Sequence, residues 1–364
     1  MSETTGEHQL NYEPVLTVTN LTKHYQVGSR FSGGIKQVQA LRGVSFVLEK
    51  RKTLAIVGES GCGKSTLAKA LMSLETPTSG SFDLGSLVKN QGKLSTRDRL
   101  AAQRRYIQMI FQDPYSSLNP RKKAWQIIAE PIIINNDKNL TKPEIKKLAI
   151  ELMGKVGLRS EFAERYPHMF SGGQRQRIGI ARALGLHPQI LICDEPVSAL
   201  DVSIQSQVLN LLIELQESLN LSLIFISHDL GVVRFIADEV IVMYLGRVVE
   251  KAPVKTLFEN PSHPYTQALL ASAPKLGILK PKTPDANISS AVIQEHPHGA
   301  PQTTISSILG ELPSPFVILP GCSFAPRCPR ATALCSSAQP ELITITGPTP
   351  NVHTHEVACH HTNG

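Results

Sequence analysis

A glycine-rich loop, 58-GESGCGKST-66, constrains the fold of this 364-residue chain more than any other feature. The loop matches G-x-x-x-x-G-K-[ST], in which glycines let backbone N–H groups face a phosphate and the following helix N-terminus adds a positive end. The apolar run 53-TLAIVG-58 leads into the loop, and the helix-like run 65-STLAKALMSLE-75 leaves it. A glycine turn before a helix is the ordinary alternative. Strand, loop and helix in this order nevertheless predict a parallel α/β sheet that binds a nucleotide phosphate.

The same motif assigns a role to each of its side chains. Lys64 is expected to bridge the β- and γ-phosphates, and the Ser65 hydroxyl is expected to bind magnesium. Cys62 stands at a variable position of the motif. The other residues expected around the nucleotide are Gly58, Glu59, Ser60, Gly61, Gly63 and Thr66.

Two acids end a second buried strand, 190-ILICDE-195. After a phosphate loop, Asp194 is expected to hold magnesium through a water. Glu195 is expected to orient and polarise the attacking water, a role typically worth about 10² to 10⁴ in rate. Surface charge at a strand end is the alternative.

Further segments predict the elements around this core. We expect strands at 15-VLTVTN-20, 44-VSFVLEK-50 and 222-SLIFIS-227 from their apolar patterns. Residues 141–157 have apolar positions at helical spacing, with Thr141 as the N-cap and Glu144 three residues later. Residues 89–105 are polar and basic, which predicts a loop and a short surface helix.

Composition limits the class of protein. The polar N-terminal stretch has no apolar run of the kind a signal peptide needs, and the longest apolar runs fall short of the roughly 18 residues of a membrane-spanning helix. We therefore expect a soluble, cytosolic chain in which thiols stay reduced. The 37 Lys+Arg against 30 Asp+Glu fit an anionic ligand, nucleic acid, a membrane surface or simply a solvated face.

The run 170-FSGGQRQR-177 forms a second anion-binding helix start, with Ser171 before two glycine amides. It resembles the signature of the ABC ATPase family, usually written LSGGQ, with Phe170 in place of the leading Leu. In that family the signature reaches across a dimer to the γ-phosphate of ATP held by the partner's phosphate loop. The resemblance thus implies ATP as the nucleotide and binding roles for Ser171, Gly172, Gly173 and Gln174.

Four more positions fit the family in order along the chain. Gln112 in 111-FQDP matches the Q-loop, which contacts magnesium and reports to a membrane subunit. Asp201 in 198-SALD matches the D-loop at the dimer interface. His228 in 227-SHD matches the switch histidine at the γ-phosphate, and Tyr25 in 23-KHYQV matches the aromatic residue that stacks on adenine.

The resemblance therefore implies an ATPase with an ABC cassette: a RecA-like parallel core, an antiparallel β subdomain and a helical subdomain at about residues 113–176. It also implies the composition of the catalytic site. The catalytic residues would be Glu195, His228 and Gln112, and the magnesium ligands would be Ser65, Gln112 and Asp194.

Longer strings narrow the resemblance to the ATP-binding subunits of oligopeptide and dipeptide importers. These strings are 112-QDPYSSLNPRKK, 166-YPHMFSGGQRQRI, 194-DEPVSALDVS, 227-SHDLGVV and 263-HPYTQALLASAP. The similarity covers nearly the whole chain and weakens at residues 277–305. It implies a peripheral subunit on the cytoplasmic face of a bacterial inner membrane. The implied partners are a second, non-identical ATP-binding subunit, two membrane permease subunits and, indirectly, an extracytoplasmic peptide-binding protein.

Other functions remain open at this point. A soluble ABC ATPase acting on nucleic acid or ribosomes is the main alternative, although this chain has one cassette and no heptad run. A binding module built around a cysteine-rich tail is another, against which the Asp194–Glu195 pair and His228 argue. The cargo is equally open, because dipeptides, longer peptides, antimicrobial peptides and nickel chelates are all handled by relatives.

Composition divides the chain into three parts. Residues 1–274 form the predicted nucleotide-binding domain, residues 275–320 a Pro-rich linker or wrapping arm, and residues 321–364 a cysteine-rich extension. The extension holds Cys322, Cys328, Cys335 and Cys359, separated by five, six and 23 residues.

These four cysteines predict a metal site. Four thiolates suit tetrahedral zinc or a [4Fe–4S] cluster, and the spacing alone leaves the two open. His353, His355, His360 and His361 would join such a site, or belong to a solvated tail. The tail contains 311-ELPSP-315, followed by 321-GC-322, 327-RC-328, Cys335 and 357-VAC-359. This order resembles the C-terminal extension of peptide-importer subunits. The resemblance implies an iron–sulfur cluster, with zinc as the alternative.

Overall fold

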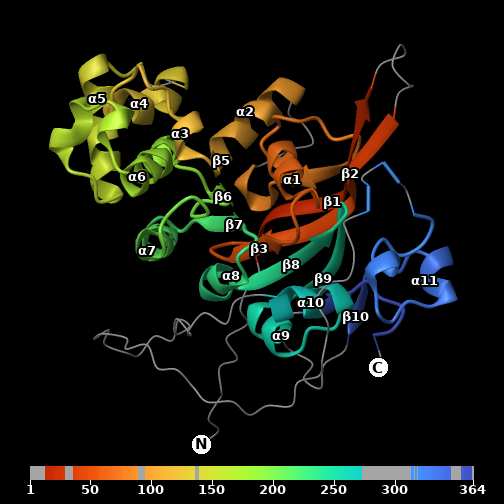
Figure 1. The fold of residues 1–364 in the computed structure, drawn as a ribbon. Helices are drawn as coiled ribbons and strands as arrows, with labels where there is room; N and C mark the ends of the chain where they lie inside the picture. Colours follow the sequence, from red (N-terminus) through yellow and green to blue (C-terminus); the bar gives the residue numbers. More distant parts are fainter. Residues whose placement is uncertain are drawn as a thin grey trace, which may run out of the picture.

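The computed structural model describes residues 13–28, 36–88, 95–135, 139–272, 313–314, 316–317, 319–345 and 354–362. Its main sheet has the strand order β10-β11-β9-β8-β3-β7-β6-β5 (Figure 1). The strands β8 (Glu239–Tyr244), β3 (Thr53–Val57), β7 (Ser222–Ile226), β6 (Ile190–Asp194) and β5 (Ile107–Ile110) run parallel to one another. This confirms the parallel α/β core predicted from the phosphate loop.

A second sheet is antiparallel and consists of β2 (Lys36–Glu49), β1 (Pro14–Val27) and β4 (Ser79–Asp83). It packs with α1 (Lys64–Leu71) on one face of the main sheet, where Leu54 and Ile56 of β3 join Leu67 and Leu71 of the helix in one core cluster. Because successive strand residues point to opposite faces, Ala55 and Val57 lie in a different cluster on the other face. β3 is therefore buried on both sides, which explains its continuous apolar sequence.

On that other face lie α7 (Val202–Leu219) and α8 (Leu230–Ile236), followed along the chain by α9 (Val254–Glu259) and α10 (Pro264–Ser272). The polar segment before β5 forms α2 (Thr96–Tyr106), as the sequence predicts. Among the described residues, no helix has the length and apolar character needed to cross a bilayer.

The helical subdomain projects from the carboxyl side of β5 as a separate lobe (Figure 1). It contains α3 (Pro114–Ser117), α4 (Ala124–Ile134), α5 (Lys142–Lys155) and α6 (Gly172–Ala183). The capping box predicted for α5 is present, since the Thr141 N–H donates to Glu144 Oε2 at 2.7 Å. Ile145 and Leu152 then face the core of the lobe, as their spacing predicts.

The C-terminal extension continues the main sheet at its edge. Strand β9 (Arg247–Pro253) pairs with β11 (His355–Val357), and β11 pairs with β10 (Ile343–Ile345), all antiparallel. The extension also contains the short helix α11 (Ala333–Ser337) and the 3₁₀ turn η6 (Ala325–Arg327). The sequence gives no sign of this pairing, because β10 and β11 are three residues long.

Within the described residues, the extension shares its core with the cassette. Phe324 is 2% exposed and lies in the same cluster as Tyr244 of β8 and Tyr265 of α10. The predicted boundaries at residues 274 and 320 stay predictions, since residues 273–312, which hold most of the predicted linker, lie outside the described part of the chain.

A buried histidine stands where the extension meets the cassette. His263 is 1% exposed; its backbone N–H donates to Glu250 Oε2 at 3.0 Å, and its Nδ1 accepts from the Tyr265 N–H at 3.0 Å. Burial lowers the pKa of His263 to about 4, against a smaller opposite effect of Glu250. The ring is therefore neutral at pH 7.

This depressed pKa predicts acid sensitivity. Between the ordinary histidine pKa and about 4, the unfolded chain binds the proton and the folded chain does not, so stability falls as pH falls. The loss at pH 5 relative to pH 7.5 should be about 2 kcal/mol. Urea unfolding gives the free energy of unfolding at both pH values. The difference between the two pH values should be smaller in His263→Asn than in the wild type by about 2 kcal/mol. The asparagine amide oxygen replaces the Nδ1 acceptor. The exposed His187→Asn serves as control, and equal pH dependence in all three proteins would contradict the assignment.

Candidate nucleotide-hydrolysis site

Two glycines give the phosphate loop its shape. Gly63 caps α1 with φ 108°, and a Cβ there would lie 2.4 Å from the Ala40 carbonyl oxygen. Gly58 has φ 151°, and a Cβ there would lie 2.2 Å from the Met243 carbonyl oxygen. Only glycine fits both positions, because the loop bends in the left-handed region while packed between β2 and β8.

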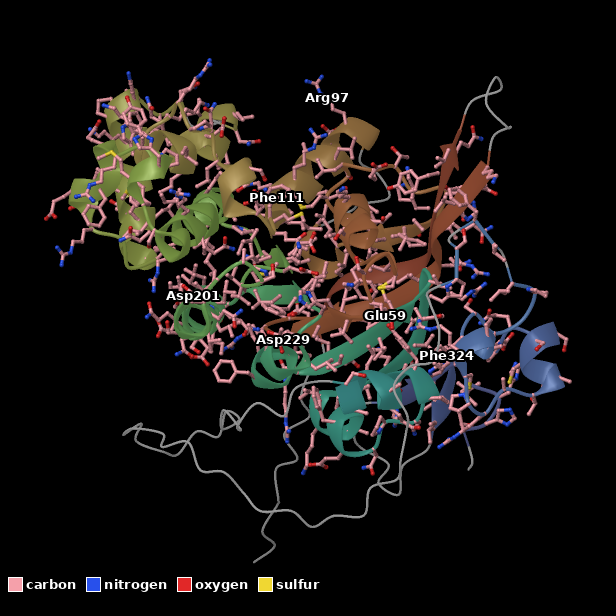
Figure 2. All side chains as sticks on the ribbon, viewed as in Figure 1. Glu59, Arg97, Phe111, Asp201, Asp229 and Phe324 are labelled. Atoms are coloured by element: carbon pink, nitrogen blue, oxygen red, sulfur yellow. The ribbon has the colours of Figure 1, made fainter. Side chains whose placement is uncertain are left out.

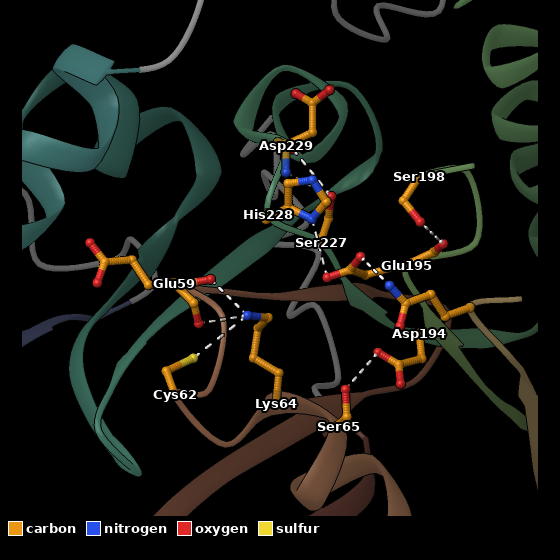
Figure 3. Close-up of polar contacts among 12 residues, drawn as sticks. Glu59, Cys62, Lys64, Ser65, Asp194, Glu195, Ser198, Ser227, His228 and Asp229 are labelled. Carbon is orange, nitrogen blue, oxygen red and sulfur yellow. Dashed lines mark hydrogen bonds and ion pairs between the residues drawn. The ribbon is translucent and has the colours of Figure 1, made fainter. Parts of the chain in front are cut away.

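Lys64 lies inside the loop and is 6% exposed. Its ammonium donates to the carbonyl oxygens of Gly58 at 2.7 Å and Glu59 at 3.0 Å, and it lies 3.7 Å from Cys62 Sγ (Figure 3). Carbonyl contacts of this kind hold the ammonium inside the loop, where it is well placed to meet an anion. Burial raises the pKa of the Cys62 thiol, with the Lys64 ammonium opposing, so Cys62 stays a neutral thiol.

Ser65 and Asp194 face each other across the start of α1. The Ser65 hydroxyl lies 3.4 Å from Asp194 Oδ1, and Asp194 is 6% exposed at the end of β6. Burial raises the pKa of Asp194, the Ser65 hydrogen bond lowers it, and the neighbouring Glu195 charge raises it further. A hydroxyl and a carboxylate oxygen side by side form the oxygen-donor set that magnesium prefers.

Glu195 is held from two sides. Its Oε2 accepts a hydrogen bond from Gln112 Nε2 at 2.9 Å, and its Oε1 lies 3.1 Å from His228 Nδ1 (Figure 3). Glu195 follows β6, Gln112 follows β5 and His228 follows β7. The carboxyl ends of these strands are adjacent in the sheet. Glu195 also has φ 46°, a conformation uncommon for a side-chain-bearing residue, and its N–H donates to the Ile226 carbonyl at 2.9 Å. The backbone thus directs this carboxylate at the edge of the phosphate loop.

An open cleft of about 250 Å³ adjoins these residues. Its lining includes six phosphate-loop residues and two of the predicted catalytic residues: Ser60, Gly61, Gly63, Lys64, Ser65, Thr66, Gln112 and Glu195. Tyr25 lies outside this lining, on β1, where it pairs with Val38, a lining residue of β2. Its predicted contact with adenine stays a prediction.

The cleft also includes residues that the sequence analysis missed. Arg42 of β2 and Leu245 line it, as do Ser314 and Val317 from the segment before the cysteines. Arg42 belongs to no nucleotide motif, and Ser314 and Val317 lie more than two hundred residues from the phosphate loop. No local pattern marks these positions, because only the tertiary fold brings them to the cleft.

The signature residues lie outside the cleft of their own chain. Ser171 caps α6, accepting from the Gln174 N–H at 3.4 Å, while Gln174 accepts from the Ser171 N–H at 3.1 Å. A Cβ on Gly173 would lie 2.5 Å from Ile204 of α7, so the helix start packs against the residues that follow Asp201. Figure 2 shows Asp201 on the α7 side of the sheet, away from Glu59 of the phosphate loop. The structure therefore separates the signature and Asp201 from the phosphate loop.

The four cysteines of the extension lie near one another without forming a ligand set. Burial raises the pKa of Cys322, Cys328 and Cys359, and charges on neighbouring cysteines, Cys335 among them, add to the shift. His361 Nε2 lies 3.5 Å from Cys335 Sγ, but His355 contacts Glu250 and His360 contacts the Ala338 carbonyl. Nowhere in the described part of the chain do three or more His, Cys, Asp or Glu residues form a group that could hold a metal ion. The predicted metal site therefore has no support in this geometry, and His353 lies outside the described residues.

Comparison with known proteins identifies the family of this chain. The family model "ABC transporter" matches residues 41–198, and "Oligopeptide/dipeptide transporter, C-terminal region" matches residues 249–301 and 289–335. The di/tripeptide transport ATP-binding protein DppF of Pseudomonas aeruginosa is 48% identical over 96% of this chain and 98% of its own length. The chain belongs to the oligopeptide/dipeptide branch of the ABC transporter ATP-binding proteins.

Other matches are consistent with this family. The dipeptide transport ATP-binding protein DppF of Escherichia coli is 49% identical over 91% of each chain. A dimeric ATP-binding cassette solved in a post-hydrolysis state with ADP and Pi is 29% identical, with a TM-score of 0.56 over 66% of this chain and 98% of that one. This ABC ATP-binding protein is thus an ATPase coupled to transport, and the nucleic-acid alternative finds no support.

The position of Lys64 predicts the effect of its removal. Lys64→Ala should weaken binding of a fluorescent ATP analogue with magnesium by about tenfold to a hundredfold, since hydrogen bonds to charged groups contribute about 1.5–3 kcal/mol. Equilibrium fluorescence titration measures the change. Lys69→Ala, at an exposed position of the same helix, is the matched control, and unchanged affinity in Lys64→Ala would exclude the phosphate contact.

Proposed function

We propose that this chain is the ATP-hydrolysing subunit of a bacterial inner-membrane importer for dipeptides or other short peptides. The observation that carries the proposal is the Glu195 carboxylate, fixed by Gln112 and His228 beside the buried Lys64 ammonium. The peptide cargo comes from the names of the relatives, which are di/tripeptide and dipeptide transport proteins. An oligopeptide transport protein of Bacillus subtilis is 46% identical, so longer peptides belong to the same proposal.

The residues present fit a magnesium–ATP complex. Lys64 would exchange its two carbonyl contacts for phosphate oxygens, and the loop N–H groups would receive the remaining phosphate charge. Ser65 and Asp194 would hold the metal, Asp194 through a water. Magnesium, when bound, neutralises charge that develops on the phosphates.

In the hydrolytic step, Glu195 would accept a hydrogen bond from the attacking water and polarise it toward the γ-phosphate. Gln112 and His228 each contact one carboxylate oxygen, which orients the side chain in this direction. The His228 side chain is 60% exposed, which leaves its ring free to turn toward a bound γ-phosphate.

A partner chain would complete the site. The signature helix start lies outside its own cleft, so Ser171 and the two glycine amides are available to the nucleotide of another subunit. Exposed apolar residues at Met169 and Val202 flank this surface and support burial in a dimer. We propose head-to-tail closure with a second, non-identical ATP-binding subunit, with Asp201 at the interface.

Closure would be passed to two membrane permease subunits through the surface between Gln112 and Lys123. This segment links the Glu195 contact to the helical lobe, since Arg182 of α6 donates to the Ser117 carbonyl. The chain would therefore sit on the cytoplasmic face of the membrane. An extracytoplasmic peptide-binding protein would select the cargo.

The proposed role of Glu195 predicts a separation of binding from turnover. Glu195→Gln should keep ATP binding and trap a closed dimer, while phosphate release falls by about 10² to 10⁴. Phosphate release and size-exclusion chromatography, both with the partner ATPase subunit present, measure these effects. Glu214→Gln, at an exposed position of α7, is the control; full hydrolysis by Glu195→Gln would remove Glu195 as the base.

We also keep the iron–sulfur cluster as a proposal, with zinc as the alternative. It is supported by the spacing of the four cysteines in the sequence, and not by the geometry of the described residues. Anaerobically purified protein should contain iron and acid-labile sulfide and absorb in the blue, and Cys335→Ser should lose all three, whereas Cys193→Ala in β6 should keep them. Stoichiometric zinc without iron would select the alternative, and absence of both metals would reject the site.

A further inference from the structure

An arginine of the cysteine-rich extension contacts the phosphate loop directly. Arg327 Nη1 lies 2.8 Å from Glu59 Oε2, and Nη2 lies 3.1 Å from Glu59 Oε1. The two parallel contacts form a bidentate pair, the geometry that a guanidinium and a carboxylate favour. The side chains are 7% and 19% exposed, so water screens the pair only weakly. Glu59 is the second residue of the phosphate loop.

The surrounding residues hold both partners in place. The Glu59 N–H donates to Tyr265 Oη at 2.8 Å, which fixes the loop backbone from α10. Arg327 Nη1 also donates to Tyr244 Oη at 3.3 Å. Phe324 packs edge-on against Tyr244 with ring centroids 5.3 Å apart, and Figure 2 shows Phe324 and Glu59 on the same side of the molecule. The turn η6 connects Phe324 to Arg327, so the aromatic anchor sets the position of the guanidinium.

The extension reaches the nucleotide cleft at two other points. Arg42, which lines the cleft, donates to Ser323 Oγ at 2.9 Å. Ser314 and Val317 form part of the cleft lining themselves. Contacts at separate positions, all on the phosphate-loop side, make the extension part of the environment of the nucleotide.

We propose that Arg327 is a positioning residue for ATP binding, which holds the phosphate loop in its binding shape through Glu59. The carbonyl of Glu59 accepts from Lys64, so the loop segment that the ion pair fixes also sets the position of the Lys64 ammonium. Arg327 directly precedes Cys328, and Phe324 lies two residues after Cys322. The fold of the cysteine segment is thereby coupled to nucleotide affinity. This inference rests on ATP binding at the phosphate loop and extends it to a residue outside the cassette motifs.

Substitution of either partner tests the coupling. Arg327→Ala and Glu59→Gln should each raise the Kd for an ATP analogue by about five- to tenfold, the lower end of the usual range for coupling between two sites. The double variant should match the single ones, because each removes the same ion pair. Arg327→Lys should recover part of the affinity. Turnover of Arg327→Ala at saturating ATP, measured with the partner ATPase, should stay within about twofold, since Glu195 and its contacts are unchanged.

Arg330→Ala is the matched control, because Arg330 lies in the same segment and contacts Gln267 of α10 instead of the phosphate loop. It should bind the nucleotide as the wild type does. Additive losses in the double variant, or equal losses in Arg330→Ala, would overturn the proposal. Loss of turnover without a change in Kd would overturn it as well.

Hydrogen exchange separates positioning from mere stability of the extension. Coupling between two sites is reciprocal, so magnesium–ATP should slow amide exchange in residues 321–337 in the Glu195→Gln background. Adding Glu59→Gln should abolish this protection, measured for each protein as the ratio of exchange rates with and without the nucleotide. Protection that persists without the ion pair would refute the inference. If the wild-type protein bound no ATP, the proposed function would fail instead. The wild-type measurement in the Lys64→Ala titration identifies that result.

Discussion

The parallel pairing of β3 with β7, and of β7 with β6, is the constraint on which the catalytic site depends. In this register Ile56 lies opposite Ile226, and Ile226 lies opposite Asp194. Each strand therefore ends at the same level, and the residues that follow meet there. The hydrogen bonds from the Glu195 N–H to Ile226 and from the Ser227 N–H to Ile56 extend the pairing beyond the strands. A shift in register would separate Glu195 from His228 and from the phosphate loop.

A second constraint acts on the other side of the phosphate loop. The loop packs on Met243 at the end of β8 and is held at Glu59 by Tyr265 and Arg327. These contacts come from α10 and from the extension, which share a core with β8. The buried, neutral His263 belongs to the same interface. Its N–H donates to Glu250, and its ring centroid lies 5.7 Å from the ring centroid of Phe324. Nucleotide site and extension are therefore parts of one packed structure.

The sequence predicts the elements that local patterns encode. The sequence predicts the phosphate loop, the acid pair after β6 and the capping box at Thr141, because each depends on residues a few positions apart. Gln112 and His228 were predicted as partners of Glu195 only through the family resemblance; the fold brings them together because the parallel strands that precede them end at the same edge of the sheet. The pair Arg327–Glu59 joins residues 268 positions apart, so no local pattern predicts it. The cysteine spacing predicted a metal group that the described residues do not form.

In the proposed dimer, each nucleotide would contact residues of both subunits. On one side, the signature helix of a chain lies outside the lining of its own cleft and begins packed against Ile204 of α7. On the other side, Ser314, Val317 and the Arg327 contact come from the same chain as the phosphate loop. Dimer closure would therefore change the contacts made by the partner's signature helix. The contacts made by Ser314, Val317 and Arg327 would move together with the phosphate loop of their own chain. The extension is thus suited to set the nucleotide affinity of its own subunit, and the partner is suited to set the timing of hydrolysis.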